Sequence, residues 1–344
     1  MRSFTLVFAV VCAFALTCNT FGQATLQNPT TPQSNNAAQQ TRPTNQAITP
    51  ITKTMAPEWY ATLSNDHNQF LNTLLDYWQQ KSDKIQRYHC QFRRYDYDTT
   101  FCNWRDPRDN RLAAASIMSG EIRFAAPDKA SYETLQVHDF GGPPKNAGED
   151  PIYVARSTKT NREKWICDGK SIHEYDFENK KLYETEIPAE MQGEGLVNSP
   201  IPFLFGASKE DILNRFWVRI ITPEGAQNEY WLEAVPKKIE DARNYKKLEL
   251  VLSRDELFLP IMLHVYAPNY NPKENNFTSR LFEFNNRKVN DSLTGFKNFL
   301  GFFVRPSKPI GWERVKRQAM QPYQQFDPAT LNRPAQNTGN TRIK

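Results

Sequence analysis

Short segments with β-strand patterning follow one another along most of this chain, and only one long helix precedes them. The helix is predicted over residues 66–81, where Phe70, Leu74 and Trp78 recur at the spacing of one helical face. The strand segments are 85–97, 120–127, 130–137, 165–167, 172–175, 181–187, 216–222, 229–236, 246–252, 259–266, 279–284 and 302–305. Consecutive strands favour antiparallel pairing, so we expect a β-rich α+β fold: a single curved antiparallel sheet around the helix.

Residues 163–206 hold the clearest local signals. Two short strands flank Asp168-Gly169, a dipeptide typical of a tight hairpin turn that needs positive φ. Further along, residues 202–206 form the charge-free segment Pro-Phe-Leu-Phe-Gly, which we expect to begin a lid or plug against the sheet. The stretch therefore marks a fold and carries no catalytic signature.

Both ends of the chain are predicted to lie outside the folded domain. Residues 1–24 combine one charge, an apolar run and a small-residue exit, which is typical of a secretory signal peptide. We therefore expect a soluble periplasmic or secreted protein. Lipidation of Cys18 stays an alternative, although Thr17 is larger than the residue usual before a lipidated cysteine. Residues 25–57 form a Thr/Gln/Asn/Pro-rich tether and residues 318–344 a similar tail, both predicted to be disordered.

Three cysteines follow the predicted signal peptide. An odd number allows at most one internal bridge in an oxidising compartment. Cys90 and Cys102 flank a predicted turn and are the candidates for a disulfide across a hairpin; the alternative is that both stay free. Cys167 lies in an apolar strand, where a buried inert thiol is commoner than a nucleophile.

Charge and motifs exclude several classes of function. The net charge of +5 comes from 43 basic and 38 acidic residues that are interspersed, so nucleic-acid binding gets little support. The five histidines lack metal-site spacing, and no nucleophile elbow, P-loop or dinucleotide fingerprint occurs. His173 is the best candidate base, but strand alternation points it and Glu174 to opposite faces. Glu184 and Glu186 fit a solvated strand face. We predict no enzyme activity, cofactor or metal.

Several short motifs occur in a collinear order within residues 58–317. They are Gly120-x-Ile122-x-Phe124-x-x-Pro127, Asp168-Gly169-Lys170, Asn198-Ser199-Pro200-Ile201-Pro202-Phe203 and Phe303-x-x-Pro306 with a later Gly311. This order resembles the LolA-like lipoprotein carriers. The resemblance implies an incomplete β-barrel of about eleven strands, with helices as a lid or plug over an apolar cavity for acyl chains. The Gly/Pro-rich residues 138–161 are predicted to be an inserted loop, and Ala126 stands where the family has a latch arginine.

Large apolar side chains are available to line such a cavity. The candidates are Trp165, Tyr175, Phe203, Phe205, Trp217, Trp231, Leu263, Phe282 and Phe284. Ordinary core packing is the alternative for each, because burial stabilises a side chain equally in a core or against a ligand.

The expected function is a noncatalytic, monomeric cell-envelope protein that binds a lipid, acyl chain or other acylated ligand. A lipoprotein or envelope protein is the expected macromolecular partner, with peripheral membrane contact. One alternative is a structural or protein-interaction module whose barrel is filled by its own side chains. A second alternative is an envelope hydrolase whose site is assembled from residues distant in the sequence.

Overall fold

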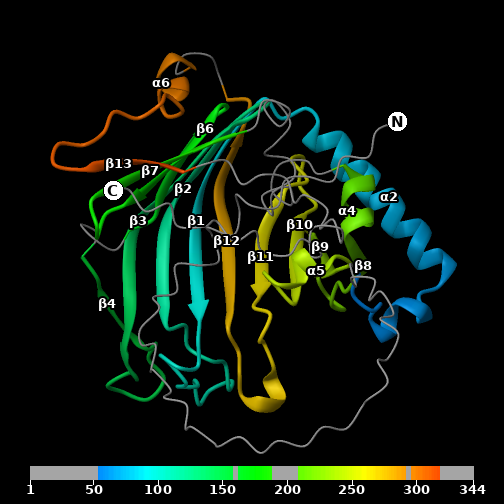
Figure 1. Cartoon of the computed structure of the whole chain (residues 1–344). Helices are drawn as coiled ribbons and strands as arrows, with labels where there is room; N and C mark the ends of the chain where they lie inside the picture. Colours follow the sequence, from blue (N-terminus) through cyan, green and yellow to red (C-terminus); the bar gives the residue numbers. More distant parts are fainter. Residues whose placement is uncertain (1–52, 158–161, 188–207, 292–295, 318–344) are drawn as a thin grey trace, which may run out of the picture.

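One open, curved sheet of 13 strands forms the body of the molecule (Figure 1). The computed structural model describes residues 53–157, 162–187, 208–291 and 296–317. The strand order is β13-β7-β6-β5-β3-β2-β1-β12-β11-β10-β9-β8, and β4 pairs with β3 beside this path. All neighbours are antiparallel except β13 and β7, which are parallel, so the sheet is mixed. The predicted β-rich incomplete barrel is confirmed.

Most predicted strands lie close to the observed ones. The strands are β1 Arg87–Tyr97, β2 Ser116–Ala125, β3 Lys129–Gly142, β4 Ile152–Ala155, β5 Lys164–Asp168, β6 Ser171–Asp176, β7 Lys181–Glu186, β8 Phe216–Ile220, β9 Glu229–Pro236, β10 Lys247–Ser253, β11 Pro260–Tyr266, β12 Ser279–Val289 and β13 Glu313–Arg317. The helices are η1 Glu58–Thr62, α2 Asn65–Ser82, α4 Lys209–Arg215, α5 Ile239–Ala242, η4 Pro272–Glu274 and α6 Phe296–Gly301.

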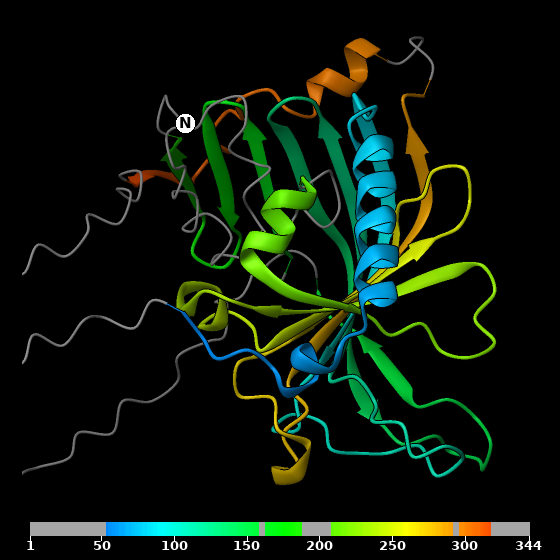
Figure 2. The ribbon, with the colours of Figure 1, turned by 90° about the vertical axis from the view of Figure 1, so that its right-hand side faces the viewer.

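The long helix α2 packs on one face of the sheet, as predicted. Ser64 caps it by accepting a hydrogen bond from the backbone N–H of His67. Its buried side chains are Leu71, Leu74, Leu75 and Trp78. With α4 it packs mainly on β8, and Figure 2 shows both helices on the same side of the sheet. We call this side the inner face and the opposite side the outer face.

Two predicted segments are wrong. Residues 138–161 are only partly loop, because β3 continues to Gly142 and β4 pairs with it. Glycines are typical of loops, so Gly141 and Gly142 suggested one. Here they lie at the end of β3, where the pairing with β4 shifts in register after Phe140. Residues 302–305 are not a strand: the backbone N–H groups of Phe302 and Phe303 donate to the preceding helical turn. The last strand is instead β13.

The β5–β6 hairpin is confirmed, but its turn is wider than predicted. The ladder ends at the pair Cys167 and Ile172. The Asp168 carboxylate accepts hydrogen bonds from the N–H groups of Lys170 and Ser171, each at 2.8 Å. Gly169 alone supplies the left-handed backbone, with φ +90°. Residues 198–206, including the expected lid or plug, lie outside the described part of the chain.

Candidate functional site

A row of aromatic rings crosses the inner face from β12 to β5. Phe284 stacks on Phe282 at 6.1 Å between ring centroids, and Phe282 lies 6.2 Å from Phe92. Phe92 stacks on Tyr132 at 4.7 Å, and Tyr132 stacks on Trp165 at 6.1 Å. We call these five residues the aromatic row. Strand alternation places all five on the face that α2 covers.

Gly120 makes the centre of this row possible. It lies on β2, opposite Phe92 of β1, and β2 separates β1 from β3. A Cβ at Gly120 would lie 2.7 Å from the Phe92 ring and 2.0 Å from the main-chain oxygen of Glu133. The missing side chain lets Phe92 and Tyr132 stack above β2.

A buried arginine lies beside the row. Arg94 is 1% exposed and makes a two-pronged contact with Glu163, at 2.7 and 2.9 Å. Its guanidinium also donates to Asp96 at 2.9 Å and to the hydroxyl of Tyr132 at 3.0 Å. Burial raises the pKa of Glu163, but the positive charge of Arg94 lowers it by more, so the pKa lies below its usual value. The charge is therefore compensated within the protein, and it fixes the ring of Tyr132.

The predicted lining residues separate onto two faces. Trp165, Leu263, Phe282 and Phe284 belong to the inner core or pack against it. The other three described candidates lie on the outer face: Tyr175, Trp217 and Trp231. Each follows or precedes an inner-face residue in its strand, and successive residues of a strand point to opposite faces. An inner ligand would not contact these three. Phe203 and Phe205 lie outside the described residues.

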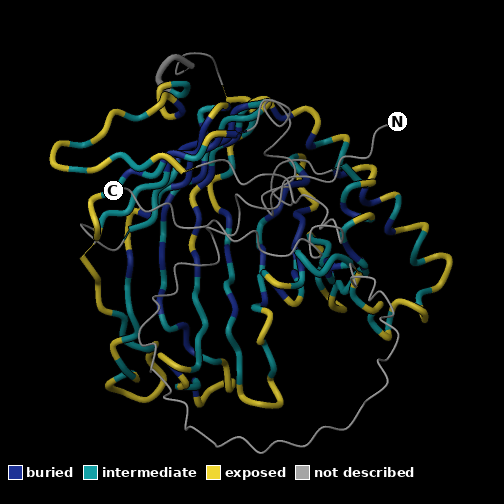
Figure 3. Tube along the Cα trace, viewed as in Figure 1, coloured by how far each residue is buried: buried dark blue, intermediate teal, exposed yellow. Residues whose placement is uncertain are grey.

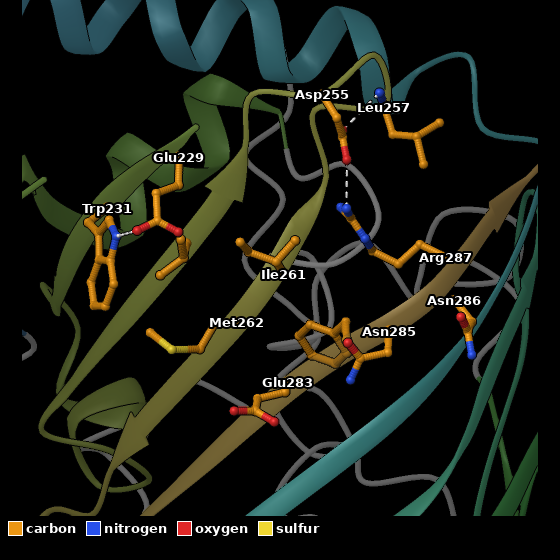
Figure 4. Close-up of a pocket in the computed structure, with 12 residues that line it drawn as sticks. Glu229, Trp231, Asp255, Leu257, Ile261, Met262, Glu283, Asn285, Asn286 and Arg287 are labelled. Atoms are coloured by element: carbon orange, nitrogen blue, oxygen red, sulfur yellow. Dashed lines mark hydrogen bonds and ion pairs between the residues drawn. The ribbon is translucent and has the colours of Figure 1, made fainter. Parts of the chain in front are cut away.

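Trp231 lines a hollow on the outer face instead (Figure 4). The hollow has a volume of about 670 Å³ and crosses β9 to β12. The Trp231 indole N–H donates to Glu229 at 2.8 Å. Across the hollow, Arg287 pairs with Asp255 at 2.7 Å. Its lining mixes charged groups with apolar ones such as Met262, and it includes Phe284, the end of the aromatic row.

The predicted disulfide is wrong. Cys90 and Cys102 are both free and buried. From Cys90, β1 runs on to Tyr97, a strand length of about 23 Å at 3.3 Å per residue. Cys102 lies just beyond that end, where its backbone N–H donates to the carbonyl of Asp98 at 2.9 Å. A bridge needs Cα atoms within about 7 Å, so the two cysteines are too far apart. Burial raises the pKa values of Cys90 and Cys167 to about 12, which disfavours thiolates.

The best candidate base is held in a structural contact. His173 is fully buried, and its Nε2 lies 3.0 Å from Asp168 Oδ2. Glu174 takes the opposite face, as predicted, and pairs with Arg317 at 2.8 Å. Within the described ranges, no group of three or more His, Cys, Asp or Glu side chains is placed to hold a metal ion.

Sequence reasoning missed the Arg94–Glu163 pair and the stacking of Phe92 on Tyr132. The signal available was the alternation along residues 85–97, which places Phe92 and Arg94 on one side. The partners come from β3 and from the residue just before β5, which no local pattern could assign. No helix in the described part is long and apolar enough to cross a membrane.

No family model matches the sequence, and no curated protein matches it. Among solved structures, an uncharacterized conserved protein of Thermus thermophilus is 9% identical, with a TM-score of 0.38; the match covers 72% of this chain and 100% of that chain. The Mycobacterium tuberculosis lipoprotein LppX is 9% identical, with a TM-score of 0.30 and coverage of 64% and 97%. A LolA superfamily protein of Nitrosomonas europaea is 9% identical, with a TM-score of 0.25 and coverage of 63% and 94%.

One of these neighbours is described as a LolA superfamily protein, but all three identities are 9% and all three TM-scores are below 0.5. Values in this range do not transfer a function.

Proposed function

We propose that this protein is a noncatalytic binding protein of the cell envelope that holds a lipid, an acyl chain or another acylated ligand against its inner face. The aromatic row is the observation that carries the proposal. It crosses five neighbouring strands, β12, β1, β2, β3 and β5, and so extends about 19 Å at 4.8 Å per strand spacing. An elongated apolar molecule can follow such a row over its whole length.

The position of the row supports this proposal. The helices α2 and α4 pack mainly on β8, at the other end of the sheet. Trp165, the last ring of the row, is only partly buried and lies on β5, away from α2. Contact with an apolar ligand would remove the rest of this indole from water, and large side chains contribute about 1.5 to 3 kcal/mol on full burial. Replacement of Trp165 should therefore weaken ligand binding most.

One observation favours a second candidate, a structural or interaction module with a self-filled barrel. Phe92 and Tyr132 are 2% and 1% exposed, so the centre of the row is already covered by protein. In that case Trp165 would serve packing alone. The two candidates differ in whether an added apolar molecule binds saturably.

A displacement assay with matched tryptophan variants separates them. A fluorescent fatty-acid analogue is bound to the full chain and displaced by an unlabelled fatty acid. We expect saturable displacement, weakened about tenfold by Trp165→Ala, since about 1.4 kcal/mol corresponds to a factor of ten. Trp231→Ala removes an indole of the same class on the outer face and should change affinity less than twofold.

Two results would contradict the proposal. Absence of binding by a folded sample would support the self-filled module. Equal losses from Trp165→Ala and Trp231→Ala would contradict an inner-face site. Export of the protein by residues 1–24, a monomeric state and an acylated protein partner belong to the same proposal.

A further inference from the structure

The segment between α6 and β13, residues 302–312, exposes three large apolar side chains. We call this segment the strap. Phe302 is 44% exposed, Val304 is 62% exposed and Ile310 is fully exposed. Figure 3 shows the strap mostly in the colour of exposed residues, at the upper edge of the sheet. Three such residues within nine positions exceed the scattered single apolar side chains that are normal on protein surfaces.

The exposure does not come from a loosely attached loop. Phe303 is 2% exposed and packs against Phe299 at 5.3 Å. Arg305 and Arg314 both pair with Glu184, at 2.8 and 2.7 Å. Trp312 packs edge-on against Phe177 at 5.3 Å. The guanidinium of Arg123 also lies 3.8 Å from the centroid of the Phe302 ring, so Phe302 is partly covered. The strap is therefore anchored at both ends and in between, while Val304 and Ile310 remain exposed.

Ile310 occupies the corner of a tight turn. The backbone N–H of Trp312 donates to the carbonyl of Pro309 at 3.1 Å, and Gly311 takes φ +78° as the third residue of the turn. A glycine at this position satisfies the turn geometry, but nothing in that geometry asks for a large apolar residue at the corner. The turn presents the Ile310 side chain to the surroundings.

Positive charge accompanies these apolar residues. Lys308 and Lys316 are exposed, and in the described part of the chain neither has an ion-pair partner. Arg305 and Arg314 share the single carboxylate of Glu184, which leaves one further positive charge. Arg317 is balanced by Glu174, and Glu313 lies 4.0 Å from Lys181. The strap and its partners thus carry a net positive charge of three.

We propose that the strap docks the protein on an anionic lipid bilayer. Val304 and Ile310 enter the interface between head groups and acyl chains, with Phe302 at its edge. Lys308 and Lys316 lie among the anionic head groups, where each basic side chain adds electrostatic attraction. This docking goes beyond the proposed ligand binding and does not require it.

Matched controls are available at the other end of the molecule. Val154 is 56% exposed on β4, and Lys273 is exposed in η4, within the β11–β12 loop. Figure 1 places β4 and the β11–β12 loop at the lower end of the sheet, and α6 with the strap at the upper end. Val154→Ser and Lys273→Glu repeat the chemistry of the strap variants far from the strap.

The test is sedimentation of the full chain with vesicles of phosphatidylcholine alone or with phosphatidylglycerol added. We expect binding to the mixed vesicles that falls as salt rises. The double variants Val304→Ser with Ile310→Ser, and Lys308→Glu with Lys316→Glu, should each weaken it on the order of tenfold or more. Val154→Ser and Lys273→Glu should stay within about twofold of the unmodified chain.

Equal binding by the strap variants and the unmodified chain would overturn the proposal, as would absence of binding to mixed vesicles. Folding of each variant is checked by its thermal unfolding. Fatty-acid displacement in the same variants keeps the two proposals apart. We expect it to be unchanged in the strap variants, and we expect Trp165→Ala to bind vesicles like the unmodified chain.

Discussion

Replacing Gly120 by alanine tests the geometry on which the aromatic row depends. The added Cβ would lie 2.0 Å from the Glu133 main-chain oxygen and 2.7 Å from Phe92. Such contacts need about 3 Å or more, so β2 and β3 must separate by roughly 1 Å or the ring of Phe92 must leave its stack. A backbone oxygen cannot rotate away as a flexible side chain can.

The expected cost follows from these two contacts. Overpacking a well-filled region costs about 1 to 3 kcal/mol, and loss of one backbone hydrogen bond between β2 and β3 adds about 1 kcal/mol. We therefore expect Gly120→Ala to lower the free energy of unfolding by about 2 to 4 kcal/mol. For a domain of this size, the melting temperature should fall by roughly 4 to 16 °C.

Urea and thermal unfolding followed by circular dichroism measure this loss. Gly301→Ala is the matched control, because a Cβ there meets nothing within 4 Å and no positive φ is involved. At the end of α6, alanine should be neutral or should stabilise by up to about 1 kcal/mol. A loss below about 0.5 kcal/mol in Gly120→Ala would refute the close approach of Phe92 and Tyr132 over β2.

Three further predictions concern the inner face and the thiols. Glu163→Gln should destabilise by about 1 to 3 kcal/mol, because it leaves buried Arg94 less compensated. Because the pKa of Glu163 is lowered, its contribution to the free energy of unfolding is present above the usual value of 4.5 and is lost as the pH falls through the lower folded value. The stability of the variant should therefore fall less in acid than that of the unmodified chain. An equal fall in both proteins would contradict this. Phe282→Ala should cost about 3 to 5 kcal/mol and outer-face Trp217→Ala clearly less, compared by urea unfolding; equal costs would contradict the two-face assignment. Thiol titration of the urea-unfolded, unreduced chain should find Cys90, Cys102 and Cys167 all reactive, and the same three thiols should be unreactive in the native domain. Two unreactive thiols in the unfolded chain would indicate a disulfide.

Local patterns sufficed for much of the fold. The spacing of apolar residues predicted α2, and β9 begins and ends at the predicted residues 229 and 236. The residues on which each of these predictions depends lie within a single helix or strand. The wrong strand at residues 302–305, Phe-Phe-Val-Arg, is rich in residues that favour strands, but no described strand pairs with it, and pairing is not visible in a single segment.

The candidate site could be predicted only in part. Alternation gives the relative phase of residues within a strand, so Trp231 and Leu232 must differ in face, but it does not say which face is covered. Size and apolarity therefore selected Tyr175, Trp217 and Trp231 together with Phe282. The stack of Phe92 on Tyr132 depends on a glycine in the strand between them, a contact across three strands.

The most direct test of an inner-face ligand is quenching of tryptophan fluorescence by a brominated fatty acid. Bromine quenches only an indole that it nearly touches, so the measurement reports which face the acyl chain contacts. We predict saturable quenching that is reduced in Trp165→Phe and unchanged in Trp231→Phe. No saturable quenching, or an equal reduction in both variants, would contradict binding along the aromatic row.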